Sequence, residues 1–194
     1  MNRDARRILV AIGMAGMTMV ATLTANAQAL PERRPLWVPD HVFAQIGTAE
    51  DARMAAVGVG WEVPALRGFV GGNSSGYVEA SIGRWVADVS DGSRSSAWVT
   101  QVGITPVLRW HPFNDPWWFT EAGIGVNVLA PLYRSSDKRF STAFNFGDHV
   151  GIGVRLGEDH RQELSLRLQH FSNAGIKDPN PGENFLQLRY TVRR

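Results

Sequence analysis

The chain has 194 residues, of which 20 are lysine or arginine, 18 are aspartate or glutamate and none is cysteine. Without cysteine it can form neither disulfides nor thiolate metal sites. Its nearly balanced charge offers no basic face of the kind that binds nucleic acid, so we expect no nucleic-acid partner.

The N-terminus has the pattern of a secretory signal peptide. A charged segment, MNRDARR, precedes the 16-residue apolar run ILVAIGMAGMTMVATL, and a small-residue cleavage site follows, either ANA at 25–27 or AQA at 27–29. We therefore predict a signal peptide at residues 1–29 and one domain at residues 30–194. Cleavage removes three arginines and one aspartate, which leaves 17 basic and 17 acidic side chains.

The rest of the chain breaks into segments in which apolar and polar residues alternate. Each segment is close to the length of about 9 to 11 residues that a tilted membrane strand needs. The pattern predicts strands at residues 41–48, 53–63, 76–89, 97–110, 117–129, 140–156, 161–172 and 184–193.

The two faces of these strands predict a membrane barrel. In WFTEAGIGVNV, Ile124 and Val126 share one face, while Glu121 and Asn127 share the other with two glycines. A soluble sandwich would place large charged side chains on its second face, whereas glycine mixed with single polar groups suits the interior of a small barrel. We predict an all-β fold, an eight-stranded antiparallel up-and-down β-barrel in the bacterial outer membrane.

The same alternation makes two further predictions. Charged residues of the inward face should form an interior network. Asp148 falls on the outward, apolar face, which predicts a bulge or a shifted register there. The predicted interior charges are Glu62, Glu79, Glu121, Arg109, Arg155, Arg167 and Arg189.

Loop lengths predict the orientation of the barrel. HPFNDP and GEDHR are tight turns, whereas VSDGSRSS, PLYRSSDKR and NAGIKDPNPGE are longer and polar. Bacterial barrels have short periplasmic turns and longer outer loops. The strand at 161–172 should therefore run outward and end at the outer leaflet.

Two polar residues lie on the apolar face of that strand. Leu164, Leu166 and Leu168 alternate along it, and the same period places His170 and Ser172 on the lipid side. Polar groups at a membrane boundary are costly unless they are hydrogen-bonded.

A serine beside a histidine suggests nucleophilic catalysis, in which the histidine is the base and a third group orients it. Asp178 and Glu183, in and after the following loop, are the candidate acids. Oxyanion donors could come from the backbone N–H groups of Ala174 and Gly175 and from two side-chain amides. Those amides belong to Asn173 and Asn180.

The segment LQHFSNAGIKDPNPGENFLQLRY resembles the C-terminal signature of the lipid A 3-O-deacylase (PagL) family, outer-membrane barrels that remove the ester-linked 3-hydroxyacyl chain at position 3 of lipid A in lipopolysaccharide. The resemblance implies that His170 is the general base, Ser172 the nucleophile of an acyl-enzyme mechanism and a loop glutamate the third member, which we assign to Glu183. It implies that residues after the serine, with Asn180, hold the oxyanion. The chain departs from the family pattern in one respect, because Asn184 stands at the spacing where the acid often lies.

The predicted partners are lipid A and outer-membrane lipid, and the mechanism requires neither a metal nor a cofactor. The sequence leaves open whether the barrel forms a homodimer. Two alternative functions also stay open: an outer-membrane phospholipase or general esterase with the same residues, and a non-catalytic structural or adhesive barrel.

Overall fold

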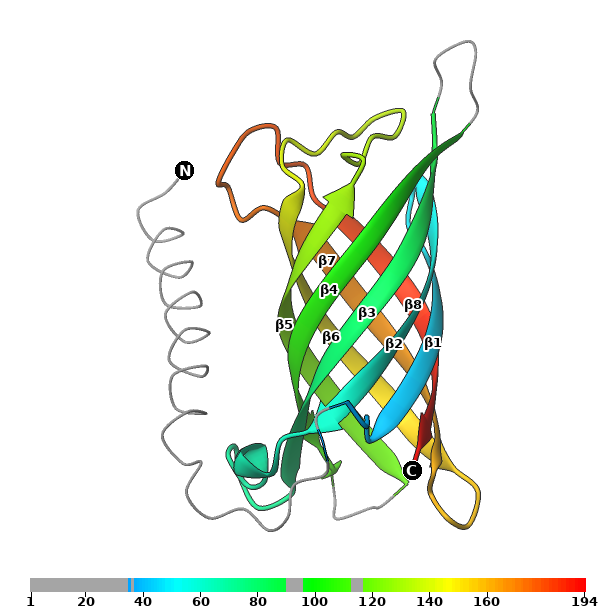
Figure 1. The fold of residues 1–194 in the computed structure, drawn as a ribbon, viewed down its shortest axis with the longest axis vertical. Helices are drawn as coiled ribbons and strands as arrows, with labels where there is room; N and C mark the ends of the chain where they lie inside the picture. The colour runs from blue at the N-terminus through cyan, green and yellow to red at the C-terminus, as the bar shows by residue number, and fades with distance from the viewer. Residues whose placement is uncertain (1–34, 36, 90–95, 113–116) are drawn as a thin grey trace. The chain divides into compact units, whose positions relative to one another are not determined.

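The computed structural model describes residue 35 and residues 37–89, 96–112 and 117–194, so the predicted signal peptide lies outside the described part. Residues 39–194 form a closed antiparallel barrel in which each strand pairs with the next and the last pairs with the first (Figure 1). The elements are β1 (His41–Thr48), β2 (Ala52–Glu62), the 3-10 turn η1 (Pro64–Leu66), β3 (Ser74–Asp88), β4 (Ser96–Trp110), β5 (Trp118–Ala130), β6 (Phe144–Leu156), β7 (Gln162–Ser172) and β8 (Glu183–Arg193).

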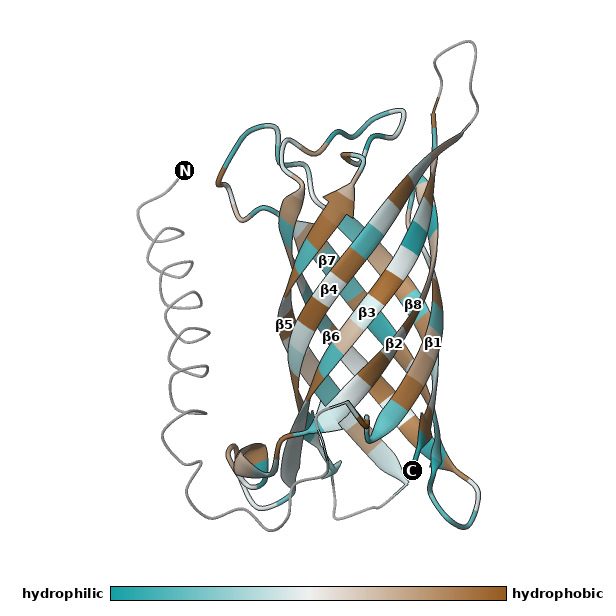
Figure 2. Cartoon of the chain, in the orientation of Figure 1, coloured by the Kyte–Doolittle hydropathy of each residue, from teal (hydrophilic) through white to brown (hydrophobic). Residues whose placement is uncertain are grey.

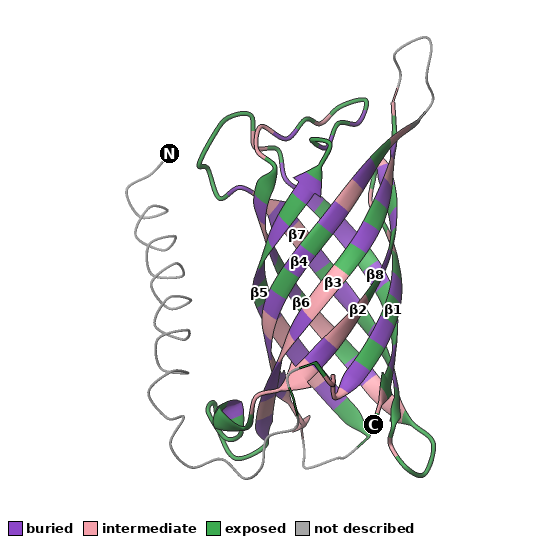
Figure 3. Ribbon diagram, in the orientation of Figure 1, coloured by how far each residue is buried: buried purple, intermediate pink, exposed green. Residues whose placement is uncertain are grey.

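The fold confirms the predicted class and the assignment of faces. Apolar and polar residues alternate along the strands (Figure 2), and buried and exposed residues alternate with the same period (Figure 3). In β5, Ile124 and Val126 are exposed on the outside, while Glu121 and Asn127 are buried in the lumen. Among the described residues, no helix is long and apolar enough to cross a membrane.

Two details differ from the sequence prediction. Strand β6 begins at Phe144 and not at residue 140, because Phe140 is buried in an aromatic cluster. The expected bulge at Asp148 is also wrong. Asp148 pairs with Ile124 on one side and with His170 on the other in an unbroken register, and its side chain faces outward.

A network of ion pairs fills the middle of the lumen, as predicted. Arg167 lies 2.6 Å from Glu121 and 3.2 Å from Glu79, and Arg189 lies 2.6 Å from Glu79. Arg109 adds a 2.9 Å pair with Glu121. Buried charges are tolerated only when they are paired and hydrogen-bonded, so this network ties β3, β4, β5, β7 and β8 together across the barrel.

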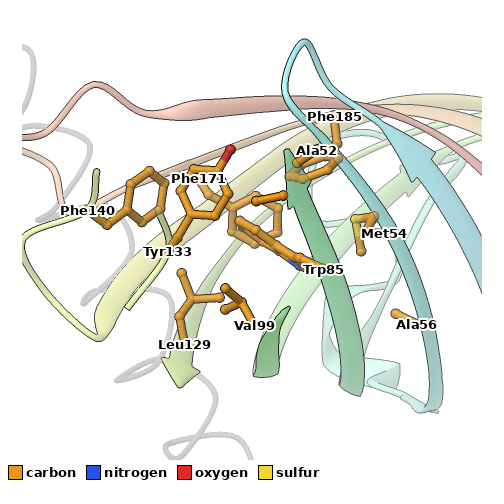
Figure 4. Packing of buried hydrophobic residues seen from close by; sticks show 11 residues of the cluster. Ala52, Met54, Ala56, Trp85, Val99, Leu129, Tyr133, Phe140, Phe171 and Phe185 are labelled. Carbon is orange, nitrogen blue, oxygen red and sulfur yellow. The ribbon is translucent and has the colours of Figure 1, made fainter. Parts of the chain in front are cut away.

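Aromatic side chains fill the end of the lumen at which β3, β5 and β7 finish, which is at the top of Figure 1 and is called the upper end below. This aromatic cluster consists of Trp85, Tyr133, Phe140, Phe171 and Phe185 (Figure 4). Trp85 packs edge-on against Phe171 and Phe185, with ring centroids 4.8 and 4.7 Å away. Tyr133 and Phe140 come from the β5–β6 loop, so this loop folds into the mouth of the barrel.

Candidate active site

His170 and Ser172 are the last two outward-facing residues of β7. The face they share carries Leu164, Leu166 and Leu168, which are exposed toward the membrane side of the barrel. His170 and Ser172 are both half-buried, and Gly182 of the loop between β7 and β8 lies against the His170 ring. The structure thus places the predicted base and nucleophile where the strand meets the upper rim.

Asn184 holds the imidazole of His170. The two residues are directly paired across β7 and β8, and His170 Nδ1 lies 2.7 Å from Asn184 Oδ1. With the proton on Nδ1, the ring donates to the amide oxygen, and Nε2 is left as an acceptor. Among the described residues, Ser172 Oγ has no hydrogen bond to the ring, a geometry that often tightens only when substrate binds.

Glu183 lies on the other face of β8, away from His170. Its side chain is 1% exposed in the lumen, where it accepts a 2.6 Å hydrogen bond from the Tyr133 hydroxyl and a 2.9 Å bond from Lys138 Nζ. Burial lowers the pKa of Lys138, but the hydrogen bond and the charge of Glu183 outweigh it and leave the pKa raised. This placement departs from the expectation that Glu183 orients the histidine. Asp178, the other candidate, is exposed in the loop.

Gly182 packs directly against the imidazole of His170. A Cβ added at this position would lie 2.6 Å from His170 Cε1 and 3.2 Å from Nε2, closer than side chains tolerate. Gly182 also has a φ of +70°, a conformation that glycine adopts without strain. The end of the Pro-Asn-Pro-Gly turn therefore covers one side of the imidazole while Asn184 fixes its edge.

The β7–β8 loop uses some of its predicted oxyanion donors for its own structure. Asn173 N–H donates to Asn180 Oδ1 at 3.0 Å, and Gly175 N–H donates to Asn173 Oδ1 at 2.9 Å. The Asn173 amide nitrogen donates to the Lys177 carbonyl at 2.7 Å. Among the described residues, the Ala174 N–H and the Asn180 side-chain nitrogen make no such bond, so these two donors stay available for a ligand.

Three residues beside the site, Asn184, Asp148 and Gly182, were not predicted as site residues, although the first two left a signal in the sequence. Asn184 has the same parity as Leu186 and Leu188, which are exposed, so alternation in β8 places it on the face of His170. Asp148, directly opposite His170, was a carboxylate on an apolar face. Gly182 is recognisable in the sequence as the last residue of a Pro-Asn-Pro-Gly turn. Its contact with the imidazole depends on how the whole loop folds, so no local sequence pattern predicts it.

Comparisons with known proteins converge on one group. Residues 55–193 match the family model described as lipid A 3-O-deacylase (PagL). The chain is 36% identical to a lipid A deacylase PagL of Bordetella bronchiseptica, over 92% of this chain and 93% of the relative, and 31% identical to one of Pseudomonas aeruginosa, over 62% and 66%. The crystal structure of the outer membrane enzyme PagL superposes with a TM-score of 0.63 at 25% identity, covering 79% of this chain and 99% of that one.

Proposed function

Because the chain belongs to the lipid A 3-O-deacylase (PagL) family, we propose that it removes the ester-linked 3-hydroxyacyl chain at position 3 of lipid A, using Ser172, His170 and Asn184 on the outside of β7 and β8. The observation that carries this proposal is the 2.7 Å contact between His170 Nδ1 and Asn184 Oδ1 beside an outward-facing serine. As a member of this family, the chain is an outer-membrane enzyme that deacylates lipid A.

The reaction begins at Ser172. His170 Nε2 takes the hydroxyl proton while Ser172 Oγ attacks the ester carbonyl, which gives a tetrahedral oxyanion. Collapse of this intermediate breaks the bond to the glucosamine oxygen, and that oxygen receives the proton held by His170. A water molecule, deprotonated by the same ring, then hydrolyses the acyl-serine and releases the 3-hydroxy fatty acid.

Asn184 takes the place of the acid in this scheme. Its amide oxygen accepts the Nδ1 proton and so selects the tautomer in which Nε2 is a base, which is the orienting role of the third group. It cannot stabilise the imidazolium by charge as a carboxylate does. A Cys-His-Asn set in papain-like proteases shows that an amide can serve as the orienting group. Glu183 supports the site from the lumen, because its bonds to Tyr133 and Lys138 fix the start of β8.

The oxyanion needs donors that point to where charge develops. The Ala174 N–H lies two residues after the nucleophile, and the Asn180 side-chain nitrogen belongs to the amide whose oxygen accepts the Asn173 N–H. That bond orients the amide, so its nitrogen is fixed before substrate arrives. Asp148, opposite His170 on the outward face, adds an acceptor for a hydroxyl of the substrate.

The position of the site suits a lipid substrate. The upper end carries the connections at residues 131–143 and 173–182, whereas the other end has the short turn at 157–161 besides the connection that contains η1. Bacterial barrels have their longer loops on the outer side, so we place the upper end in the outer leaflet. There the ester lies near the headgroup boundary and its acyl chain can lie along Leu164, Leu166 and Leu168. A water-soluble substrate would have to enter the lipid to reach this outward-facing site, which is unfavourable.

The test is the mass spectrum of lipid A from a bacterial host that makes each variant. The parent chain is expected to remove the mass of one 3-hydroxyacyl group, whereas Ser172→Ala should leave lipid A intact at equal membrane levels. Ser81→Ala, on β3 at the opposite wall, is the matched control and should act like the parent chain. Intact lipid A with the folded parent chain would reject the proposal. Hydrolysis of purified phospholipid at a rate equal to that of lipopolysaccharide would favour the general esterase.

A further inference from the structure

A groove runs across the outside of the barrel, away from the catalytic residues. Its volume is about 640 Å³, and it crosses the outward faces of β4, β3, β2, β1 and β8 and ends at Leu164 of β7. Ala44 and Ala55, on neighbouring strands, form the floor of the groove, which is recessed because their side chains are small. The apolar walls and the upper end are formed by Ile46, Val57, Ile82, Leu188, Arg84 and Thr100.

Arg84 lines the upper end of this groove, and Arg53 lies beside it. Arg84 and Arg53 are both exposed on the outward face. Arg84 pairs across the strands with Ala55, which is two residues from Arg53, so the two cations are diagonal neighbours, with backbones about 7 to 8 Å apart. Among the described residues neither makes an ion pair with a carboxylate.

The Arg84 guanidinium is held in place by uncharged partners. Its Nη1 donates a 2.8 Å hydrogen bond to Thr100 Oγ1, and its Cζ lies 5.2 Å from the centroid of the Trp98 ring. These contacts fix the planar group and leave its other N–H donors unused. An arginine on the lipid face is unfavourable in the membrane interior and is tolerated near the headgroups, so both cations are placed to meet an anion there.

The height of these arginines matches the upper rim. Arg53 is the second residue of β2 and Arg84 lies four residues before the end of β3, where both strands meet the upper end. The groove descends from Thr100 and Arg84 toward Leu188, across four strand intervals or about 19 Å. A ligand that fits has a negative headgroup at the rim and an apolar chain below it.

We propose that this groove is a non-catalytic binding site for a second molecule of lipid A, with a phosphate on Arg53 and Arg84 and an acyl chain between Ala44 and Ala55. Guanidinium groups bind phosphate through paired N–H donors, and two neighbouring arginines suit the doubly charged group of lipid A. The arginine end of the groove lies on β2 and β3, three and four strands from β7 in the closed barrel, and only the far end of the groove reaches β7, at Leu164, six residues before His170.

The test uses Ser172→Ala protein, so that binding is measured without turnover and does not depend on the proposed reaction. Native mass spectrometry with bisphosphorylated lipid A should show two copies bound per barrel. Adding Arg53→Gln and Arg84→Gln should weaken the second copy roughly tenfold or more, because charge-assisted bonds are lost. Arg67→Gln with Arg161→Gln makes the same change of charge at the other rim and should retain both copies.

A second variant tests the groove without touching its charges. Ala55→Leu fills the floor and should also displace the second copy while the barrel stays folded. A single copy on the Ser172→Ala protein would overturn the proposal, as would two copies on the double arginine variant. Equal displacement by phosphatidylglycerol would show a general anionic-lipid surface and reject lipid A as the specific occupant. A change in the monomer–dimer ratio with lipid binding unchanged would assign the groove to a second copy of this chain.

Discussion

The two faces of the sheet at the upper ends of β7 and β8 are made of neighbouring residues but have opposite tasks. On the outside, His170, Ser172 and Asn184 are partly exposed and held by few contacts. On the inside, Phe171 and Glu183 are buried, the first in the aromatic cluster and the second between Tyr133 and Lys138. In the proposed mechanism the outer face carries the reacting groups, while the buried contacts of the inner face hold the two strands in place.

The largest effect should come from Asn184 on the outer face. Asn184→Ala removes the acceptor of the Nδ1 proton, so His170 loses its preferred tautomer, and we expect kcat to fall on the order of 10²- to 10³-fold. The urea midpoint of unfolding in micelles should stay the same, since Asn184 is exposed. Deacylation of purified lipopolysaccharide gives the rate. A variant as active as the parent chain would show that Asn184 does not orient the ring.

Gly182 tests the same face without removing any catalytic group. Gly182→Ala pushes a methyl group against the imidazole, and misplacement by about 1 Å can reduce turnover about 100-fold. Gly175→Ala is a matched control, because Gly175 has a φ of +79° and an added Cβ there meets no atom within 4 Å. Both variants place an alanine at a positive φ and so introduce a similar backbone strain. Equal losses of activity would therefore contradict a specific contact between position 182 and His170.

Glu183 tests the inner face. Glu183→Gln removes the buried anion of Lys138, which should lower the free energy of unfolding by about 1 to 3 kcal/mol and reduce kcat less than Asn184→Ala does. Glu50→Gln is the control, because Glu50 lies 3.7 Å from Lys138 but is 79% exposed in its side chain. If Glu183→Gln abolished turnover while stability stayed unchanged, Glu183 would be the catalytic acid after all.

The smallest effect concerns pH. Lys138 has a pKa above its usual 10.5 in the folded chain, so its bond to Glu183 adds stability that is fully present below pH 10.5 and is lost as pH rises through the folded value. We expect the β5–β6 loop to resist proteolysis up to pH 10.5 and to become cleavable above it. Lys138→Met should be cleaved equally at all these pH values. Loosening of the parent chain near pH 9 would contradict the raised pKa.

Much of the fold could be predicted because a barrel strand repeats every two residues. The period alone separated Glu121 and Asn127 from Ile124 and Val126, and it placed His170 outside. Applied to β8, the same period places Asn184, and not Glu183, on the outward face that carries His170. The loops gave no such signal, because the burial of Phe140 and the contact of Gly182 with His170 depend on residues far away in the chain.

The filled lumen determines how substrate and product can reach and leave the enzyme. Among the described residues, ion pairs occupy the middle of the lumen and aromatic rings fill its upper end, so the described part of the barrel leaves no open channel through its lumen. Substrate must arrive, and the freed fatty acid must leave, by lateral diffusion within the lipid sheet. A cell could then carry many copies of this enzyme without making its outer membrane more permeable to small solutes.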